Sequence, residues 1–191
     1  MGDAINLVNN FKVGNVIFNC GDFNDLESDL IKVLKIKYYS CIKELKIKYY
    51  LCIKELNIDN NKLYFLQTKE YDNENDNSNV IYLNYNDYKF LFIGDAEVGR
   101  EKEILNKYKI SDIDFLKVGH HGSNTLSSKE FIDNINPKYS LISVGRNNRY
   151  GHPKGSVLDI LKDSKIYRTD LDGSIEIRLN KNGYNIRTCP P

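Results

Sequence analysis

Apolar residues recur along the chain with two different spacings, which predict both helices and strands. From Ala4 to Phe11 they fall every three to four positions, which predicts a short amphipathic helix. The run from Val13 to Asn19 is short, apolar and rich in β-branched residues, so we expect a buried strand. A second helix is predicted to begin at Leu26, with Asp25 as its N-cap.

The second helix leads into an internal repeat. KIKYYSCIKEL, from Lys35 to Leu45, is followed at once by KIKYYLCIKEL, from Lys46 to Leu56. One tandem copy is too little for a solenoid, which needs at least three units. Eleven residues are about three helical turns, so a helix that reaches Ile36 can continue through both copies on one apolar stripe. The same letters also suit a strand, and a copying event without function is the simplest origin of the repeat.

From Lys62 the pattern changes to strands and then alternates between strands and helices. The strands KLYFLQT, SNVIYLNY and YKFLFIG come first, the last two joined by a tight turn at Asn86-Asp87. The loop EYDNENDNSN is expected to be solvated, because it lacks the Gly and the final Glu of a calcium loop. We then expect helices at 98–107, 128–135 and 156–162, strands at 114–118, 139–144 and 165–169, and a hairpin turning at Asn182-Gly183.

Short alternations of helix and strand are typical of a layered α/β protein. A meandering first half and an alternating second half predict two sheets packed face to face, with helices outside. A chain of 191 residues predicts about one domain at roughly 150 residues each. We therefore expect residues 1–191 to form a single domain that carries the duplication at 35–56.

Composition excludes several classes of protein. The 27 basic and 26 acidic residues give a net charge of +1, which provides no long-range attraction to nucleic acid. No apolar run approaches the ~20 residues of a membrane span, and no signal peptide is visible, so the cytoplasm is the default location. The four cysteines form no C-x-x-C pair and are expected to be free thiols. They are Cys20, Cys41, Cys52 and Cys189.

Three loops that follow apolar strands hold the residues best suited to chemistry. Asp95 follows KFLFI, the pair His120-His121 follows DFLKV, and His152 lies in the loop after SLISVG. These are all the histidines of the chain. Strand ends in α/β sheets fix loop roots rigidly and often carry sites. Carboxylate and imidazole groups are ligands for Zn²⁺ or Mn²⁺, so the loops form a candidate metal site.

The motifs FIGDAE, LKVGHHGS, LISVGRNNRYGHP and YRTDLDGSI occur in the order of the later motifs of the metallo-β-lactamase-fold hydrolases. From Ala4 to about Ile177, the chain resembles the subgroup related to the ComEC/Rec2 competence proteins of DNA uptake. The resemblance implies an αββα four-layer sandwich and metal-dependent hydrolysis of phosphodiester bonds in nucleic acid. Family relatives can be attached to membranes, and the complete family site holds two ions, Zn²⁺ or Mn²⁺.

The resemblance also assigns roles to individual residues. Asp95 corresponds to the metal-bridging aspartate, and one of His120 and His121 to the last histidine ligand. His120 is favoured as that ligand because it follows the glycine. Catalytic roles are implied for Asp95, His121 and His152, the histidines acting at the phosphate or the leaving group. Lys117 and Ser123 would be neighbours of the site.

The family's main ligand motif, H-x-H-x-D-H or H-x-D-x-D-H, does not occur in this sequence. The helix at 4–11 resembles the one that follows that motif, so we expect a fold truncated at its N-terminus. A catalytic zinc site has three protein ligands, and Asp95 with one or two histidines supplies only part of one. We therefore expect weak metal binding and little or no catalysis by this chain alone.

Two other functions remain open. The chain could be a non-catalytic remnant or binding module, acting beside a partner that supplies the absent half, such as an upstream segment or a membrane-channel domain of a parent protein. A serine hydrolase built on Ser123 is disfavoured, because the chain lacks the G-x-S-x-G turn that presents such a nucleophile. The sequence leaves the oligomeric state open.

Overall fold

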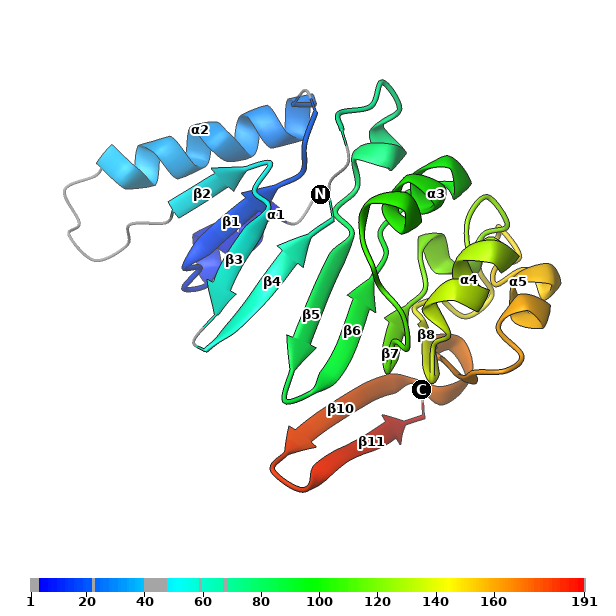
Figure 1. The fold of residues 1–191 in the computed structure, drawn as a ribbon. Helices are drawn as coiled ribbons and strands as arrows, with labels where there is room; N and C mark the ends of the chain where they lie inside the picture. Colours follow the sequence, from blue (N-terminus) through cyan, green and yellow to red (C-terminus); the bar gives the residue numbers. More distant parts are fainter. Residues whose placement is uncertain (1–3, 22, 40–47, 59, 67–68, 191) are drawn as a thin grey trace. The chain divides into compact units, whose positions relative to one another are not determined.

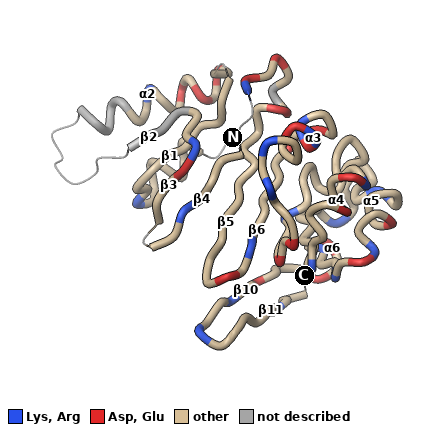
Figure 2. Tube along the Cα trace, in the orientation of Figure 1, with Lys and Arg blue, Asp and Glu red and all other residues tan. Residues whose placement is uncertain are grey.

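The computed structural model describes residues 4–21, 23–39, 48–58, 60–66 and 69–190. The chain divides into two compact units, Met1–Ile53 and Lys54–Pro191, called here the N-terminal and C-terminal units (Figure 1). The single-domain expectation stays a prediction. Basic and acidic residues are interspersed along both units (Figure 2). Among the described helices, none is both long and apolar enough to cross a membrane.

The N-terminal unit contains two helices and two strands. They are α1 (Ala4–Asn10), β1 (Asn15–Phe18), α2 (Asp25–Tyr39) and β2 (Lys48–Leu51). The strands β1 and β2 pair in parallel, and a small core of Val8, Phe18, Leu30 and Leu34 lies between the elements. The first helix and the first strand are confirmed close to their predicted bounds.

The N-cap of α2 is Asn24, so the prediction of Asp25 is wrong by one position. The side chain of Asn24 accepts a hydrogen bond from the Glu27 N–H at 3.0 Å, and the Glu27 carboxylate accepts one from the Asn24 N–H at 3.0 Å. This reciprocal capping box satisfies two N–H groups at the start of the helix, whereas Asp25 alone would satisfy one.

The two copies of the repeat adopt different structures. The letters KIKYY end helix α2 in the first copy, and the last three of them lie in strand β2 in the second copy. The expected continuation of the helix through the second copy is therefore wrong, while residues 40–47 lie outside the described residues. Lys, Ile and Tyr tolerate both conformations, so the parallel pairing of β2 with β1 decides the structure of the second copy.

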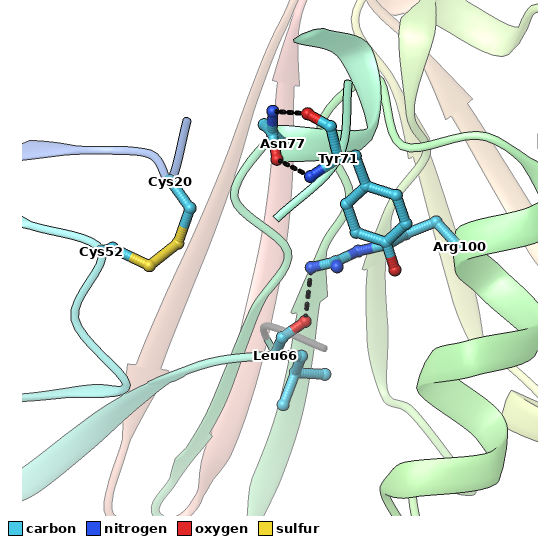
Figure 3. Close-up of a disulfide and its surroundings, with 6 residues drawn as sticks. All are labelled: Cys20, Cys52, Leu66, Tyr71, Asn77 and Arg100. Carbon is cyan, nitrogen blue, oxygen red and sulfur yellow. Dashed lines mark hydrogen bonds between the residues drawn. A yellow bond between two sulfur atoms is a disulfide. The ribbon is translucent and has the colours of Figure 1, made fainter. Parts of the chain in front are cut away.

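A disulfide joins Cys20 and Cys52, whose Cα atoms are 4.5 Å apart (Figure 3). The register that pairs Phe18 with Leu51 places the two cysteines just beyond the ends of β1 and β2. The expectation of free thiols is wrong for these two, because their proximity comes from strand pairing and not from sequence spacing. Cys189 is free and exposed, and Cys41 lies outside the described residues.

We predict that Cys52→Ser lowers the free energy of unfolding of the N-terminal unit by about 2–4 kcal/mol, because the unfolded chain regains the entropy of an open loop. Urea titrations under non-reducing conditions measure the loss. The same titrations in excess dithiothreitol should give equal values for both proteins. Cys189→Ser is the control and should change nothing. A non-reduced digest that links Cys20 to Cys41 would contradict the pairing.

The C-terminal unit is built on one seven-stranded mixed sheet, in the order β3-β4-β5-β6-β7-β8-β9. The first four strands pair antiparallel, and β6 to β9 pair in parallel. The strands are β3 (Glu55–Ile58), β4 (Asn61–Phe65), β5 (Ile81–Tyr85), β6 (Tyr88–Phe92), β7 (Phe115–Lys117), β8 (Tyr139–Ile142) and β9 (Lys165–Arg168). The mixed α/β class is confirmed.

The prediction that the two halves of the chain form separate sheets is wrong for these strands. β6, from the meandering half, pairs directly with β7, from the alternating half, with Phe90 opposite Phe115. β6 pairs with β5 along one edge and with β7 along the other, so it joins the two halves in one sheet.

Three helices connect the parallel strands and lie along the sheet (Figure 1). They are α3 (Val98–Lys107), α4 (Lys129–Ile135) and α5 (Gly155–Ile160), and all three are confirmed within two residues at each end. Ser128 caps α4 by accepting from the Phe131 N–H. Leu91 and Leu116, adjacent on β6 and β7, share a fully buried core with Ile104 of α3 and Phe131 of α4.

An aromatic row covers the opposite face of the sheet. Phe90, Phe115 and Tyr139 are aligned across β6, β7 and β8, and neighbouring rings stack at 4.7 and 5.3 Å. The hairpin of β10 (Ser174–Asn180) and β11 (Gly183–Cys189) places Tyr184 edge-on to this row. The hairpin is confirmed, although its two turn residues are Lys181 and Asn182 and not Asn182 and Gly183.

Short one-turn segments complete the described chain. They are η1 (Glu74–Asn77), η2 (His120–Gly122) and α6 (Thr169–Asp172), none of which the sequence pattern predicts. η1 orders the acidic loop: Asp76 accepts a hydrogen bond from the Glu97 N–H, and Asn77 is buried and bonded to the backbone of Tyr71 (Figure 3). The expectation of a solvated loop is therefore only partly correct.

Two buried charged residues of α3 hold the helix in place. Arg100 donates to the Leu66 carbonyl oxygen at 2.8 Å, with its guanidinium against the Tyr71 ring (Figure 3). Glu101 accepts from the backbone N–H groups of Ser127 and Ser128, one on each carboxylate oxygen. Burial raises the pKa of Glu101 above its ordinary value, although these hydrogen bonds oppose the shift.

We predict that Glu101→Gln lowers the free energy of unfolding by about 1–3 kcal/mol, because the amide group turns a donor toward one of the two N–H groups. Since the pKa of Glu101 is raised on folding, the wild type loses stability as pH rises from the ordinary glutamate range through that raised pKa. The variant should lack this part of the slope in urea titrations across pH. Glu130→Gln, at an exposed position of α4, is the control, and equal pH slopes in wild type and Glu101→Gln would refute the assignment.

Candidate functional site

The three predicted loops meet at one edge of the seven-stranded sheet. β6, β7 and β8 run parallel, so the loops that follow them all leave from their carboxyl ends. Backbone hydrogen bonds continue the pairing past the strands: the Ile93 N–H donates to Lys117 at 3.1 Å, and the Val118 N–H donates to Leu141 at 2.9 Å. The three loops therefore start side by side at this edge, while the convergence of Asp95 and the histidines on one ion stays a prediction.

Gly94 and Gly119 bring the first two loops into direct contact. The His120 N–H donates to the Gly94 carbonyl oxygen at 3.2 Å, so the residue before Asp95 is bonded to His120. A Cβ atom at position 119 would collide with that carbonyl oxygen and with the Ile93 side chain. The glycine at 119 is required for this approach.

Gly122 makes the corresponding contact with the third loop. Its φ of +82° lies in the left-handed region, and a Cβ there would be 2.6 Å from the Cβ of Pro153. The Lys154 N–H donates to the Gly122 carbonyl oxygen at 2.9 Å. The turn that carries His120 and His121 is thus packed directly against the residues that follow His152.

Both histidines of the pair adopt left-handed backbone conformations, with φ of 39° at His120 and 56° at His121. Such conformations cost of order 1–3 kcal/mol each in a residue with a side chain and persist where the surroundings enforce them. Hydrogen bonds from Gly122 N–H to Gly119 and from Ser123 N–H to His120 close the turn. Strain of this kind is common at functional sites.

The three imidazoles lie close together. The ring centroid of His120 is 6.0 Å from that of His152 and 6.3 Å from that of His121. The Nδ1 atoms of His120 and His152 are buried and lack a hydrogen-bond partner among the described residues. His121 is exposed and places Nδ1 2.6 Å from the Ser143 carbonyl oxygen. Because a carbonyl only accepts, His121 carries its proton on Nδ1 and leaves Nε2 to act as an acceptor when the ring is neutral.

Burial and neighbouring positive charges favour the neutral form of His152. Burial lowers the pKa of His152, and the positive charges of Lys154 and of the other two histidines lower it further. Burial also lowers the pKa of Lys117, while the carboxylate of Asp95 opposes that shift. Lys117 and Asp95 are therefore close enough to interact, as the resemblance to the family implied.

The donors present fit part of a metal site. Asp95 offers a carboxylate, and His120 and His152 each hold a buried ring nitrogen with no partner, which is the chemistry that Zn²⁺ or Mn²⁺ requires. Among the described residues, however, no group of three or more His, Cys, Asp or Glu side chains is arranged to hold an ion. The assignments of Asp95 and His120 as ligands, and of Asp95, His121 and His152 as catalytic residues, stay predictions.

The contacts of Ser123 are those of a residue that stabilises a turn. It is buried, its hydroxyl lies 3.1 Å from that of Thr125, and it accepts from the Thr125 N–H at 3.4 Å. This arrangement suits a residue that stabilises the turn. It gives no support to a serine nucleophile.

The third loop contains an ordered network that the sequence did not reveal. Asn148 accepts from the His152 N–H at 2.9 Å and donates to the His152 carbonyl oxygen at 2.7 Å. Tyr150 lies nearly parallel to the His152 ring, with an angle of 17° and a centroid distance of 6.0 Å. The one sequence signal is an asparagine four residues before a histidine, which is too common to identify the pair.

We predict that Gly119→Ala lowers the free energy of unfolding by about 1–3 kcal/mol, because the added methyl group overpacks the contact with Gly94. Gly99→Ala is the matched control. A Cβ at position 99, in helix α3, meets no atom within 4 Å, so this change should stabilise the protein by about 0.5–1 kcal/mol. Thermal denaturation of both variants measures the difference, and equal effects of the two substitutions would exclude the close approach.

Part of this chain is similar in sequence to known proteins. No protein-family model matches it. Over 120 residues it is 36% identical to ComE operon protein 3 of Bacillus subtilis, covering 62% of this chain and 16% of that protein. Over 126 residues it is 34% identical to competence protein ComA of Neisseria gonorrhoeae, covering 62% and 18%. Over 106 residues it is 32% identical to recombination protein 2 of Haemophilus influenzae, covering 54% and 13%.

The chain thus spans less than a fifth of the length of these relatives. A solved structure of a metallo-β-lactamase-superfamily protein from Thermotoga maritima aligns with a TM-score of 0.39 and 15% identity, covering 68% of this chain and 76% of that one. The homology to the competence proteins therefore rests on the sequence matches and not on this weak structural similarity.

Proposed function

We propose that this chain, which is a distant homologue of the ComEC/Rec2/ComA competence proteins, contributes part of a metal-dependent phosphodiesterase site that acts on nucleic acid. The observation that supports the proposal is the meeting of the three strand-end loops: the His120 N–H donates to the carbonyl oxygen of Gly94, the residue before Asp95, and the His120 ring lies 6.0 Å from the His152 ring. The whole protein's activity and substrate belong to the proposal, because the chain spans so little of its relatives.

The fold assigned by this proposal is the αββα metallo-β-lactamase-type sandwich. The seven-stranded sheet, with α3, α4 and α5 beside it, would be one half of that sandwich (Figure 1). The aromatic row on the other face of the sheet supports this, since an apolar face of a sheet is normally covered by a second layer.

Each residue of the site would have a different role. Asp95 and His120 would hold metal, Zn²⁺ or Mn²⁺, through their carboxylate and ring nitrogen. When bound, such ions polarise a phosphoryl oxygen and lower the pKa of a coordinated water. Because the Nδ1 proton of His121 is donated to the Ser143 carbonyl oxygen, Nε2 would first take up a proton, and it would then contact the phosphate or pass that proton to the leaving oxygen. His152, whose pKa is lowered, would lie beside the same ligand, and Lys117 would offset phosphate charge beside Asp95.

A second candidate is a non-catalytic binding module on the same scaffold. It is favoured by the incomplete donor set, because the described residues offer no group of three metal ligands. In this case the chain would bind nucleic acid without cleaving it, or would act only beside a partner that supplies the missing donors.

We predict that the isolated chain binds Mn²⁺ weakly and that Asp95→Asn and His120→Gln each lower the affinity about tenfold or more, because each removes one of few donors. Isothermal titration calorimetry measures the affinities. Asp87→Asn is the matched control: it removes the same charge from the β5–β6 turn, at the opposite end of the strand that leads to Asp95. Unchanged affinity in both site variants would contradict the assignment of the ligands.

Activity separates the two candidates. Hydrolysis of bis(p-nitrophenyl) phosphate in Mn²⁺ should be near background for the chain alone. It should rise when a segment that carries H-x-D-x-D-H, from the same reading frame or from a relative, is joined ahead of Met1. The rise should be lost again on Asp95→Asn. A joined protein that binds metal fully and remains inactive would favour the binding module.

A further inference from the structure

The loop between β8 and α5 holds an exposed aromatic ring beside the histidines. Tyr150 is 61% exposed, although its neighbour His152 lies nearly parallel to it at 6.0 Å. The Arg149 guanidinium lies 5.0 Å from the centre of the Tyr150 ring and donates to its hydroxyl at 2.9 Å. An aromatic ring left open to solvent next to a candidate site is available to a ligand.

The ring is held on a rigid support. The Lys154 ammonium donates to the Tyr150 carbonyl oxygen at 2.8 Å, and the Gly151 N–H donates to the Asn148 carbonyl oxygen at 3.3 Å. Asn148 also bonds twice to the backbone of His152. The backbone around Tyr150 is therefore ordered before any ligand arrives, which lowers the entropy that binding would cost.

The same loop is basic. Between Ser143 and Val157 the chain has Arg146, Arg149 and Lys154 and no Asp or Glu. The nearby carboxylate of Asp170 is already paired with Arg168 at 2.6 Å. The loop thus combines an open ring with three basic residues and no acidic residue of its own, although the chain as a whole is nearly neutral.

We infer that Tyr150 stacks on a nucleobase of single-stranded nucleic acid whose backbone phosphate lies toward Arg149 and the histidines. This inference rests on the proposed function and names its substrate class. Base stacking on exposed aromatic rings, combined with nearby cations, is how proteins hold single strands. A base in a duplex is already stacked and paired, so it cannot cover the ring without being extruded. A phosphate ligand alone would use the cations and leave the ring exposed.

The test compares two ligands of equal length and charge. One is fluorescein-labelled oligodeoxythymidylate, and the other is the same deoxyribose-phosphate chain without bases. Fluorescence anisotropy in EDTA measures binding without hydrolysis. The wild type should bind the base-containing strand about five- to a hundredfold more tightly, the range expected for stacking of one base. Tyr150→Ala should lose this preference while keeping its affinity for the abasic chain.

Two further variants exclude a general loss of structure. Tyr150→Phe should keep the preference, because phenylalanine stacks as well and lacks only the hydroxyl. Tyr85→Ala removes an exposed tyrosine from the hairpin at the opposite end of the β6 strand and should behave as the wild type.

Three results would overturn the inference: an unchanged preference in Tyr150→Ala, a wild type that does not distinguish the two chains, or tighter binding of a thymidine-adenosine duplex than of the single strand. The metal-binding assay on Asp95 and His120 uses no nucleic acid. Failure of the stacking inference and failure of the proposed metal site are therefore distinguishable.

Discussion

The geometry of the candidate site depends on the parallel pairing of β6, β7 and β8 together with the missing side chains at Gly119 and Gly122. Parallel strands deliver their loops to one edge, but loops with ordinary side chains would stay apart. The two glycines remove that obstacle, one against the Gly94 carbonyl and the other against Pro153. The three histidine rings lie near one another, and the loop that carries Asp95 reaches them, because the backbones at these glycines are in contact.

That contact has an energetic consequence. His120 and His121 hold left-handed conformations that residues with side chains avoid, and the buried ring nitrogens of His120 and His152 lack partners in the described part of the chain. Both are costs to folding that hydrogen bonds around the turn offset. A metal or a phosphate-bearing ligand would give these ring nitrogens the partners they lack, and this links the strain of the turn to the proposed function.

The helices and strands of the C-terminal unit were predicted well because the spacing of apolar residues and the turn residues within each element indicate its type. α3 has the expected bounds, and Asn86 and Asp87 both adopt the positive φ of a tight hairpin turn. The site loops could be located for the same reason, since each follows an apolar strand. Features that depend on long-range pairing could not be predicted this way, and the repeat is the clearest case. The same five letters end a helix in one copy and lie largely in a strand in the other, according to the neighbour that each copy meets.

The disulfide, the single sheet and the support beneath Tyr150 were missed for the same reason. Cys20 and Cys52 become neighbours only through the register of β1 with β2, and β6 joins the two halves of the sheet only through its second edge. The role of Asn148 in ordering the loop is revealed only by its two hydrogen bonds to the backbone of His152. Sequence thus indicated which residues are suited to chemistry, and tertiary structure determined which backbone segments lie side by side.

The most direct measurement follows the three imidazoles by NMR as Mn²⁺ is added, which is practical because the chain contains only three histidines. Paramagnetic broadening falls off steeply with distance from the ion. We expect the ring signals of His120 and His152 to broaden together at the lowest Mn²⁺ concentrations, along with the amide of Asp95. Broadening confined to the acidic loop around Asp72, with all three imidazoles unaffected, would contradict a shared metal position at the edge of the sheet.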